Sequence, residues 1–305
     1  MKRLALKLLL FLLVFLAYDK LFILVANRSA ETEVDKRLEY LIEGQINKEL
    51  VIIGSSRGSR DIIASQIEEE TGLSAYNLCY PGSSMEFHEF ILKTLLKFNE
   101  PPKILILMVD DNNAFMDGGD RILFRRDRLY PLVRHSYIWK EMAQRGYLDS
   151  ELAGIIVLQR LNKYNFDLRQ KMPTPLDTIM ACGSMPITWQ DKGIDWEFPT
   201  KEKPYPREKE LPEKVAAFQS MVQTCEAHGV ELVITFPPNY QIPSQSFENR
   251  IRELSGDNVH CHHYNTENPI YRDQNYFFDT EHLMREAASI YTDEIIDFLK
   301  AFMPS

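Results

Sequence analysis

The stretch "ELVIIGSSRGSRDI", from Glu49 to Ile62, decides the fold of this 305-residue chain. Its four consecutive apolar residues, 50–53, end at Gly54, a pattern typical of a strand that is buried on both faces of a sheet. Residues 59–72 then follow the spacing of a helix and stop at a glycine. A buried strand, a tight turn and a helix in this order predict the first half of a β-α-β unit.

The same alternation continues along the chain. Further strands are predicted at residues 74–80, 103–109, 230–236 and 258–263, and further helices at 83–98, 213–229, 247–254 and 282–302. Because strands and helices alternate, we expect an α/β domain over residues 49–305 with three α/β/α layers and a doubly wound, five-stranded, mainly parallel sheet. A large, mostly helical insertion at about 114–210 interrupts it, with helices predicted at 132–145 and 151–169.

The N-terminus "MKRLALKLLLFLLVFLAYDKLFILVANRSA" predicts a membrane anchor over residues 1–30. Residues 4–26 supply the roughly 20 apolar positions that a spanning helix needs, although Asp19 and Lys20 interrupt them. A cleaved signal peptide is the alternative, but cuts after Ala17, Ala26 or Ala30 would leave no small residue at the third position before the cut. Positive charge precedes the segment and acidic residues follow it, so we expect the rest of the chain outside the cytoplasm. Residues 31–48 are predicted to form a charged, helical stalk.

Composition narrows the range of partners and cofactors. The formal net charge of -9 argues against nucleic acid as a partner. The stretch "GSSRGS" lacks both the dinucleotide fingerprint and the lysine of a phosphate-binding loop, so no nucleotide cofactor is expected. The four cysteines form no C-x-x-C pair, and "HCHHYN" (260–265) is interpreted as a polar strand end, so no metal site is expected. Disulfide pairing stays open.

Two short motifs contain groups that could carry chemistry. "GSSRG" matches G-x-S-x-G with Ser56 at its centre, a turn that presents a serine hydroxyl at the start of a helix, where backbone N–H groups can hold an oxyanion. The alternative is a Gly-Ser turn with a helix-capping serine. In "YFFDTEHLM", Asp279 and His282 are a carboxylate and a base three residues apart, as a serine nucleophile requires. Here the alternative is that Asp279 or Thr280 caps the last helix.

Taken together, these motifs resemble the SGNH/GDSL-type serine hydrolases. The resemblance covers about residues 49–302, apart from the insertion, and it implies a flavodoxin-like SGNH hydrolase fold. It implies that Ser56 is the nucleophile, that Asp279 and His282 complete a catalytic triad, and that Gly82 in "CYPGSS" contributes an oxyanion-hole N–H beside that of Ser56. The family's G-x-N-D block corresponds to "MVDDNNAF", which has no glycine, so Asn112 or Asn113 would supply the remaining donor.

Two positions call for comment within this resemblance. Ser55 stands where the family usually has aspartate. Arg57, next to the nucleophile, either binds an anionic group of the substrate or pairs on the helix surface. An α/β-hydrolase also carries G-x-S-x-G, but its serine follows a middle strand, whereas this one follows the first.

The resemblance also implies a function. Membrane-anchored members of the family add or remove acetyl groups on exported polysaccharides. We therefore expect an esterase or O-acyltransferase that acts on an O-acyl ester, most economically an O-acetyl ester, of an extracytoplasmic glycan or another cell-envelope substrate. The expected location is the inner membrane, with the domain on the periplasmic or extracellular side. The alternative is a catalytically degenerate domain that binds a glycan or a membrane-bound acyltransferase partner.

Overall fold

The structure is a computed structural model that describes the chain except for residues 111–113, 117–123, 190–195, 257–258 and 303–305. The chain divides into two compact units. We call Met1–Glu39 with Arg125–Met172 the N-terminal unit, and Tyr40–Phe124 with Pro173–Ser305 the sheet unit. The first part of the expected insertion, residues 125–172, thus groups with the N-terminal segment, and its last part belongs to the sheet unit.

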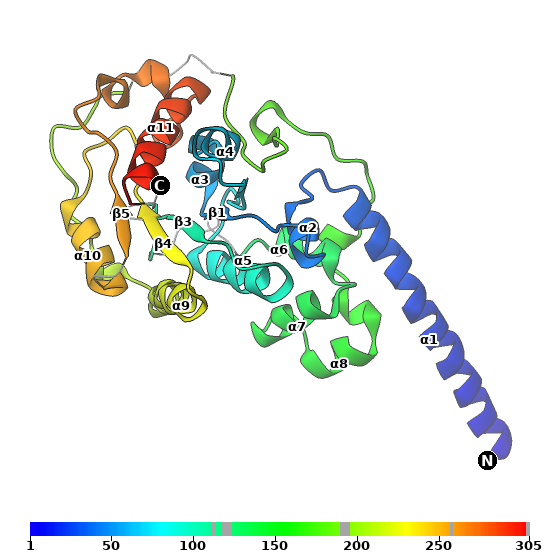
Figure 1. Ribbon diagram of the computed structural model, residues 1–305. Coiled ribbons are helices and arrows are strands. Elements are labelled where there is room, and N and C mark those ends of the chain that lie inside the picture. The colour runs from blue at the N-terminus through cyan, green and yellow to red at the C-terminus, as the bar shows by residue number, and fades with distance from the viewer. Residues whose placement is uncertain (111–113, 117–123, 190–195, 257–258, 303–305) are drawn as a thin grey trace. The chain divides into compact units, whose positions relative to one another are not determined.

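The sheet unit contains one five-stranded parallel sheet (Figure 1). Its strands are β1 (Leu50–Ile53), β2 (Ala75–Asn77), β3 (Ile104–Met108), β4 (Glu231–Thr235) and β5 (His260–His262), in the order β2-β1-β3-β4-β5. All four pairings are parallel, so the predicted α/β class and the five strands are confirmed. β1 therefore lies inside the sheet, and the residues that follow it emerge between the ends of β2 and β3.

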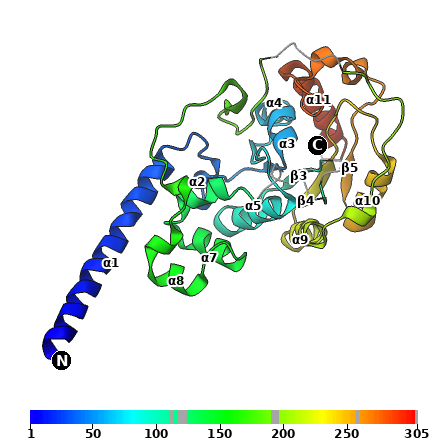
Figure 2. The ribbon, with the colours of Figure 1, turned by 180° about the vertical axis from the view of Figure 1, so that it is seen from behind.

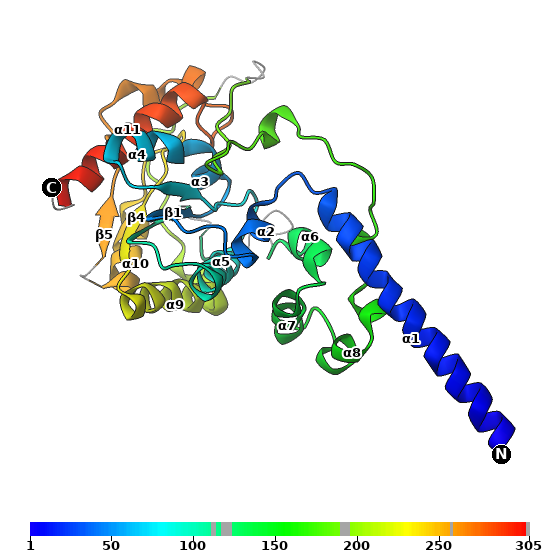
Figure 3. The same ribbon diagram turned by 45° about the vertical axis from the view of Figure 1, so that its right-hand side comes forward.

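Helices cover both faces of this sheet (Figure 3). One layer holds α5 (Met85–Phe98) and α9 (Pro212–His228), which pack on each other, with α10 (Gln245–Ser255) beside α9. The other layer holds α3 (Ser56–Asp61), α4 (Ala64–Thr71) and α11 (Arg285–Phe302). Because both faces are covered, β1 and β3 are buried along their whole length, which is why they appear in the sequence as continuous apolar runs.

Two predicted helices of the sheet unit have different bounds. The helix expected at 59–72 is two helices, because the chain is extended at Ile62 and Ile63. Partners from elsewhere satisfy this break: Thr292 Oγ1 accepts the N–H of Ile63 at 3.1 Å, and Ser184 Oγ donates to the carbonyl of Ile62 at 2.9 Å. The last helix begins at Arg285 rather than at 282, so the segment that contains His282 is a loop.

The N-terminal unit holds the long helix α1 (Lys2–Glu31) together with α6 (Arg126–Leu129), α7 (Ser136–Gln144) and α8 (Ser150–Ile155) (Figure 2). The elements that pack on α1 are the 3-10 turns Tyr130–Leu132, Val157–Arg160 and Lys163–Asn165. The helix predicted at 151–169 is wrong beyond residue 155, where short 3-10 turns at Val157–Arg160 and Lys163–Asn165 replace it. In the predicted stalk, the helical parts are the end of α1 and the short α2 (Arg37–Ile42). Among the described helices, α1 is long and apolar enough to cross a membrane.

Candidate active site

Ser56 is the first residue of α3, directly after the turn that leaves β1. The preceding residue, Ser55, caps this helix: its side chain accepts the N–H of Arg57 at 3.3 Å, and its carbonyl accepts the N–H of Ser59 at 3.1 Å. The two interpretations of "GSSRG" therefore apply to different serines. Since Ser55 does the capping, the hydroxyl of Ser56 is left for another partner.

That partner is His282. The Nε2 atom of His282 lies 2.8 Å from Ser56 Oγ, and its Nδ1 atom lies 2.8 Å from each carboxylate oxygen of Asp279. One oxygen of Asp279 also accepts the main-chain N–H groups of Glu281, at 2.8 Å, and His282, at 2.9 Å. Asp279 thus closes the 279–282 turn and orients the imidazole, and it does not cap the last helix, which begins at Arg285.

The electrostatics of this group set the tautomer of the histidine. Burial by itself would raise the pKa of Asp279, but the hydrogen bond and charge of His282, with the two main-chain N–H groups, lower it below its ordinary value. An ionised Asp279 accepts the Nδ1–H of His282, which leaves the Nε2 lone pair directed at the hydroxyl of Ser56. This arrangement allows His282 to take a proton from Ser56.

Gly82 lies in a turn that is fastened to the serine turn. The N–H of Ser83 donates to the carbonyl of Tyr80 at 3.2 Å, and Gly82 has a φ of 68° after Pro81, the pattern of a type II turn, in which glycine is favoured. The carbonyl of Gly54 accepts the N–H of Tyr80 at 2.9 Å and the hydroxyl of Ser83 at 3.3 Å. The predicted oxyanion glycine is therefore held beside the turn that carries Ser56.

Close packing explains the two glycines of the G-x-S-x-G motif. A Cβ atom on Gly54 would lie 2.7 Å from the Cβ of Met108, and one on Gly58 would lie 2.5 Å from the Sγ of Cys79. Both distances are too short for a side chain. The turn therefore packs directly against the ends of β3 and of the strand region that precedes Gly82, and this fixes the start of α3.

Three predicted site residues keep the status of predictions. Asn112 and Asn113 lie outside the described residues, so their part in the oxyanion hole is untested. The side chain of Arg57 is buried, and its Nε lies 3.9 Å from Oδ1 of Asp110. Arg57 is therefore paired with a carboxylate, but from a buried position rather than on the helix surface, and its role in substrate binding stays a prediction.

Sequence reasoning missed the buried polar side chains that support the contact between Ser56 and His282. Oδ1 of Asp61, at the end of α3, accepts the N–H of Leu283 at 3.0 Å, and burial raises the pKa of Asp61 well above its ordinary value. Asn77, at the end of β2, donates to the carbonyls of Gly58 at 2.8 Å and Ile62 at 3.1 Å. The signal in the sequence was an acidic residue and an amide that interrupt apolar segments.

Part of the expected insertion also braces the site. The N–H of Met185 donates to the carbonyl of Ser59 at 2.6 Å, and the N–H of Arg285 donates to the carbonyl of Ile187 at 2.8 Å. Residues 185–187 therefore connect the helix that begins at Ser56 with the chain that follows His282. A segment whose sequence shows no helix or strand periodicity thus holds two parts of the site together.

The histidines near 260 have protein partners. Nδ1 of His262 lies 2.8 Å from Oγ1 of Thr235, and His260 stacks on Phe302 with ring centroids 4.4 Å apart. Among the described residues, no three His, Cys, Asp or Glu side chains are placed to share a metal ion. The four cysteines are free thiols.

No protein-family model matches this sequence, and no curated protein aligns with it at a significant level.

Proposed function

We propose that this protein is an SGNH-type serine esterase or O-acyltransferase whose catalytic triad is Ser56, His282 and Asp279. The observation that carries the proposal is the unbroken chain of contacts from Ser56 Oγ to His282 Nε2 and from His282 Nδ1 to Asp279, each 2.8 Å long. The position of Ser56 after an interior strand of a parallel sheet supports it, since ligands of such sheets bind outside the carboxyl ends of the strands.

The chemistry follows from this geometry. His282 takes the proton of Ser56 as Oγ attacks the ester carbonyl, and Asp279 stabilises the imidazolium that forms. The N–H groups of Ser56 and Gly82 hold the negative oxygen of the tetrahedral intermediate. The intermediate expels the alcohol, which receives the proton from His282, and an acyl group remains on Ser56. A water molecule or a sugar hydroxyl then takes the acyl group by the same steps in reverse.

The proposed substrate is an O-acyl, most economically O-acetyl, ester of a glycan outside the cytoplasm. Two features support this choice: the resemblance of the motifs to exported SGNH proteins, and an N-terminal helix that is long and apolar enough to anchor the chain in a membrane. Water as acceptor makes the protein an esterase, and a sugar hydroxyl makes it an acyltransferase.

A fluorophosphonate probe tests the triad directly. The probe should label the wild-type protein and should fail to label Ser56→Ala. Ser55→Ala is the matched control in the same turn: it removes only a helix cap, at a cost of about 1 kcal/mol, and should still be labelled. Absence of labelling in folded wild-type protein would contradict the proposal and would favour the non-catalytic, glycan-binding alternative.

A second experiment separates hydrolysis from transfer. Acetate release from an O-acetylated exported polysaccharide is measured in the presence and absence of an unacetylated acceptor glycan. An esterase releases acetate in both cases, whereas a transferase moves the acetyl group to the acceptor glycan. In either case Ser56→Ala should abolish the reaction.

A further inference from the structure

The polar pair in the middle of α1 is covered by another part of the N-terminal unit. The carboxylate of Asp19 is fully buried and accepts the N–H groups of Val157 at 2.9 Å and Leu158 at 2.7 Å. The ammonium of Lys20 donates to the carbonyl of Ile155 at 2.8 Å. Asp19 thus caps the 3-10 turn that begins at Val157, and its charge does not face the surroundings of α1.

Before Asp19 the surroundings of α1 are different. Nearly all of its residues up to Tyr18 are exposed, while the buried ones start at Asp19 and continue along one face. The exposed stretch from Leu4 to Tyr18, which is apolar apart from Lys7, covers only about 22 Å at 1.5 Å per residue. A bilayer's hydrocarbon core is about 30 Å thick, so the level of Asp19 would lie within or at the edge of the apolar layer.

The segment that covers Asp19 exposes apolar side chains at this level. Apolar residues recur at every third position and are exposed by 44%, 67%, 37% and 46%; we call them the docking face: Leu152, Ile155, Leu158 and Leu161. The opposite side of the same segment is buried, and there the guanidinium of Arg160 donates to the carbonyls of Ala153 at 2.9 Å and Val133 at 3.1 Å. The docking face is therefore an ordered, amphipathic surface beside α1.

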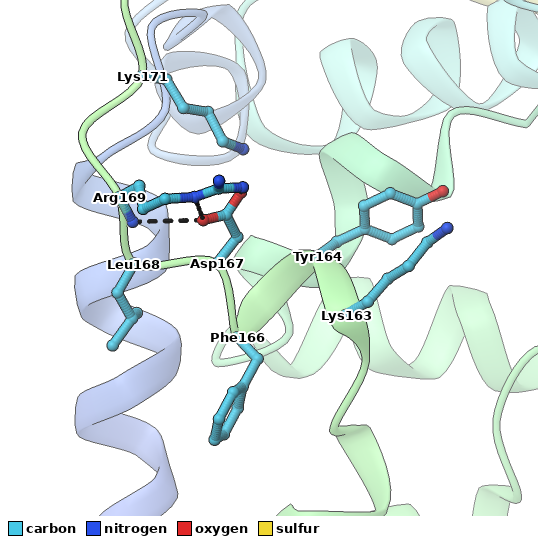
Figure 4. A pocket seen from close by; sticks show the side chains of 7 residues that line it. All are labelled: Lys163, Tyr164, Phe166, Asp167, Leu168, Arg169 and Lys171. Atoms are coloured by element: carbon cyan, nitrogen blue, oxygen red, sulfur yellow. Dashed lines mark hydrogen bonds and ion pairs between the residues drawn. The ribbon is translucent and has the colours of Figure 1, made fainter.

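In the next segment, too, apolar and charged side chains are separated along the length of α1. Figure 4 shows Phe166 and Leu168 pointing the same way along α1, away from Lys171. They line a hollow of about 900 Å³ together with Lys163, Tyr164, Asp167, Arg169 and Lys171. Lys171 lies at the other end, where its N–H donates to the carbonyl of Thr32. Apolar side chains thus point toward the N-terminal half of the helix, and cations lie toward its C-terminal end, as expected at a membrane interface.

We propose that the docking face sits on the lipid surface around α1, with its side chains at the boundary between headgroups and acyl chains. The bilayer then begins at Asp19 rather than beyond Ala26. The apolar surface of α1 continues directly into the docking face, because Ile155 and Leu158 are bonded to the residues where the exposed part of α1 ends. Lipid is therefore the partner that covers the docking face. The docking face adds apolar surface at the level where the exposed apolar part of α1 is too short for the bilayer.

Depth measurements on the full chain test this. Cys182 and Cys261 are replaced by serine, and a polarity-sensitive dye is attached to Ile155→Cys in vesicles of phosphatidylethanolamine and phosphatidylglycerol that carry a lipid-bound quencher. Leu12→Cys reports insertion of α1, and Gln170→Cys, exposed and next to Lys171, is the control expected in water. We expect a blue shift and loss of emission for Leu12→Cys and Ile155→Cys, and neither for Gln170→Cys. A label at Ile155→Cys that behaves like the one at Gln170→Cys would overturn the proposal, as would an unquenched Leu12→Cys.

A second variant guards against an effect of the dye. The label is moved to Leu161→Cys, and Ile155 and Leu158 are both replaced by glutamate. We expect the label at Leu161→Cys to be quenched by lipid in the parent and to lose this quenching in the double variant. Equal quenching in both would show that these side chains do not hold the segment on lipid, and it would overturn the proposal.

Discussion

The carboxylate of Asp61 accepts the main-chain N–H of Leu283 at 3.0 Å, so the helix that begins at Ser56 is tied directly to the loop that carries His282. Both residues are buried and lie 222 positions apart in the chain. The distance between Ser56 and His282 therefore depends on this bond as well as on the packing of α3 against α11.

Replacing Asp61 tests this tie. Asp61→Ala leaves the N–H of Leu283 buried without an acceptor, so we expect a loss of about 1–3 kcal/mol in the free energy of unfolding and a fall in kcat at unchanged fold. Asp61→Asn keeps an acceptor for this N–H group and should lose less of the unfolding free energy and less of kcat. Urea unfolding and ester hydrolysis on the same preparations measure the two effects. Equal losses for the two variants would show that the bond to Leu283 is not what matters.

The raised pKa of Asp61 adds a pH dependence to this comparison. The folded protein keeps a proton on Asp61 at a pH where the unfolded chain has lost it, so this residue's stabilising contribution is largest below the ordinary aspartate pKa of about 4. It declines as the pH rises toward the folded pKa. Asp61→Asn should remove this decline, which urea unfolding at several pH values would detect.

Gly58 gives a prediction about packing. Gly58→Ala places a Cβ 2.5 Å from Sγ of Cys79 and 3.2 Å from Cβ of Met108, and overpacking of this kind typically costs about 1–3 kcal/mol. Cys79→Ala removes the sulfur, so the double variant Gly58→Ala/Cys79→Ala should be more stable than the sum of the single losses predicts. A double-mutant cycle of unfolding free energies measures this coupling. Strict additivity would contradict the contact.

The strands and the grouping of Ser56, His282 and Asp279 could be predicted from the sequence because their signals are local. An apolar run such as residues 50–53 marks a buried strand, and the polar residues that follow such runs come together at one end of a parallel sheet. Ser56 was identified in this way, whereas Asp279 and His282 were identified from their three-residue spacing just before the last helix. The structure brings the three side chains into contact.

The parts that could not be predicted depend on contacts between distant segments. The break at Ile62 and Ile63 is stabilised by Ser184 and Thr292, which no local pattern connects with α3. The helix expected at 151–169 ends early because Asp19, more than 130 residues earlier, caps a 3-10 turn there instead. Local helical spacing cannot reveal an acceptor that distant residues supply.

Buried histidines predict how stability depends on pH. Burial lowers the pKa of His88 to about 3, with the charge of Lys214 adding to the effect, and burial with the charge of His263 lowers the pKa of His262 to about 4. The unfolded chain binds these protons near pH 6.5, so the stability that the neutral histidines provide is present above that pH and is lost as the pH falls.

Between pH 7 and pH 5 each histidine should lower the free energy of unfolding by about 1–2 kcal/mol. His88→Gln, which cannot take up a proton, should show a correspondingly smaller loss, and urea unfolding at the two pH values checks this. Surface-exposed His228, which is bonded to the carbonyl of Thr224, offers His228→Gln as a control for the effect of a histidine-to-glutamine substitution on the unfolding free energy at pH 7. An unchanged pH dependence in His88→Gln would contradict the prediction.

Asp279→Asn separates the orientation of His282 from the integrity of the fold. An asparagine keeps an oxygen that can accept the N–H groups of Glu281 and His282, so the 279–282 turn should persist and the unfolding free energy should change little. Its amide group, however, presents hydrogens to Nδ1 of His282 and favours the tautomer with the proton on Nε2, which cannot accept the proton of Ser56. Under the proposed function, kcat for ester hydrolysis should fall by about 10⁴-fold with KM nearly unchanged. A variant that kept most of its activity while folding normally would show that Asp279 does not act through His282.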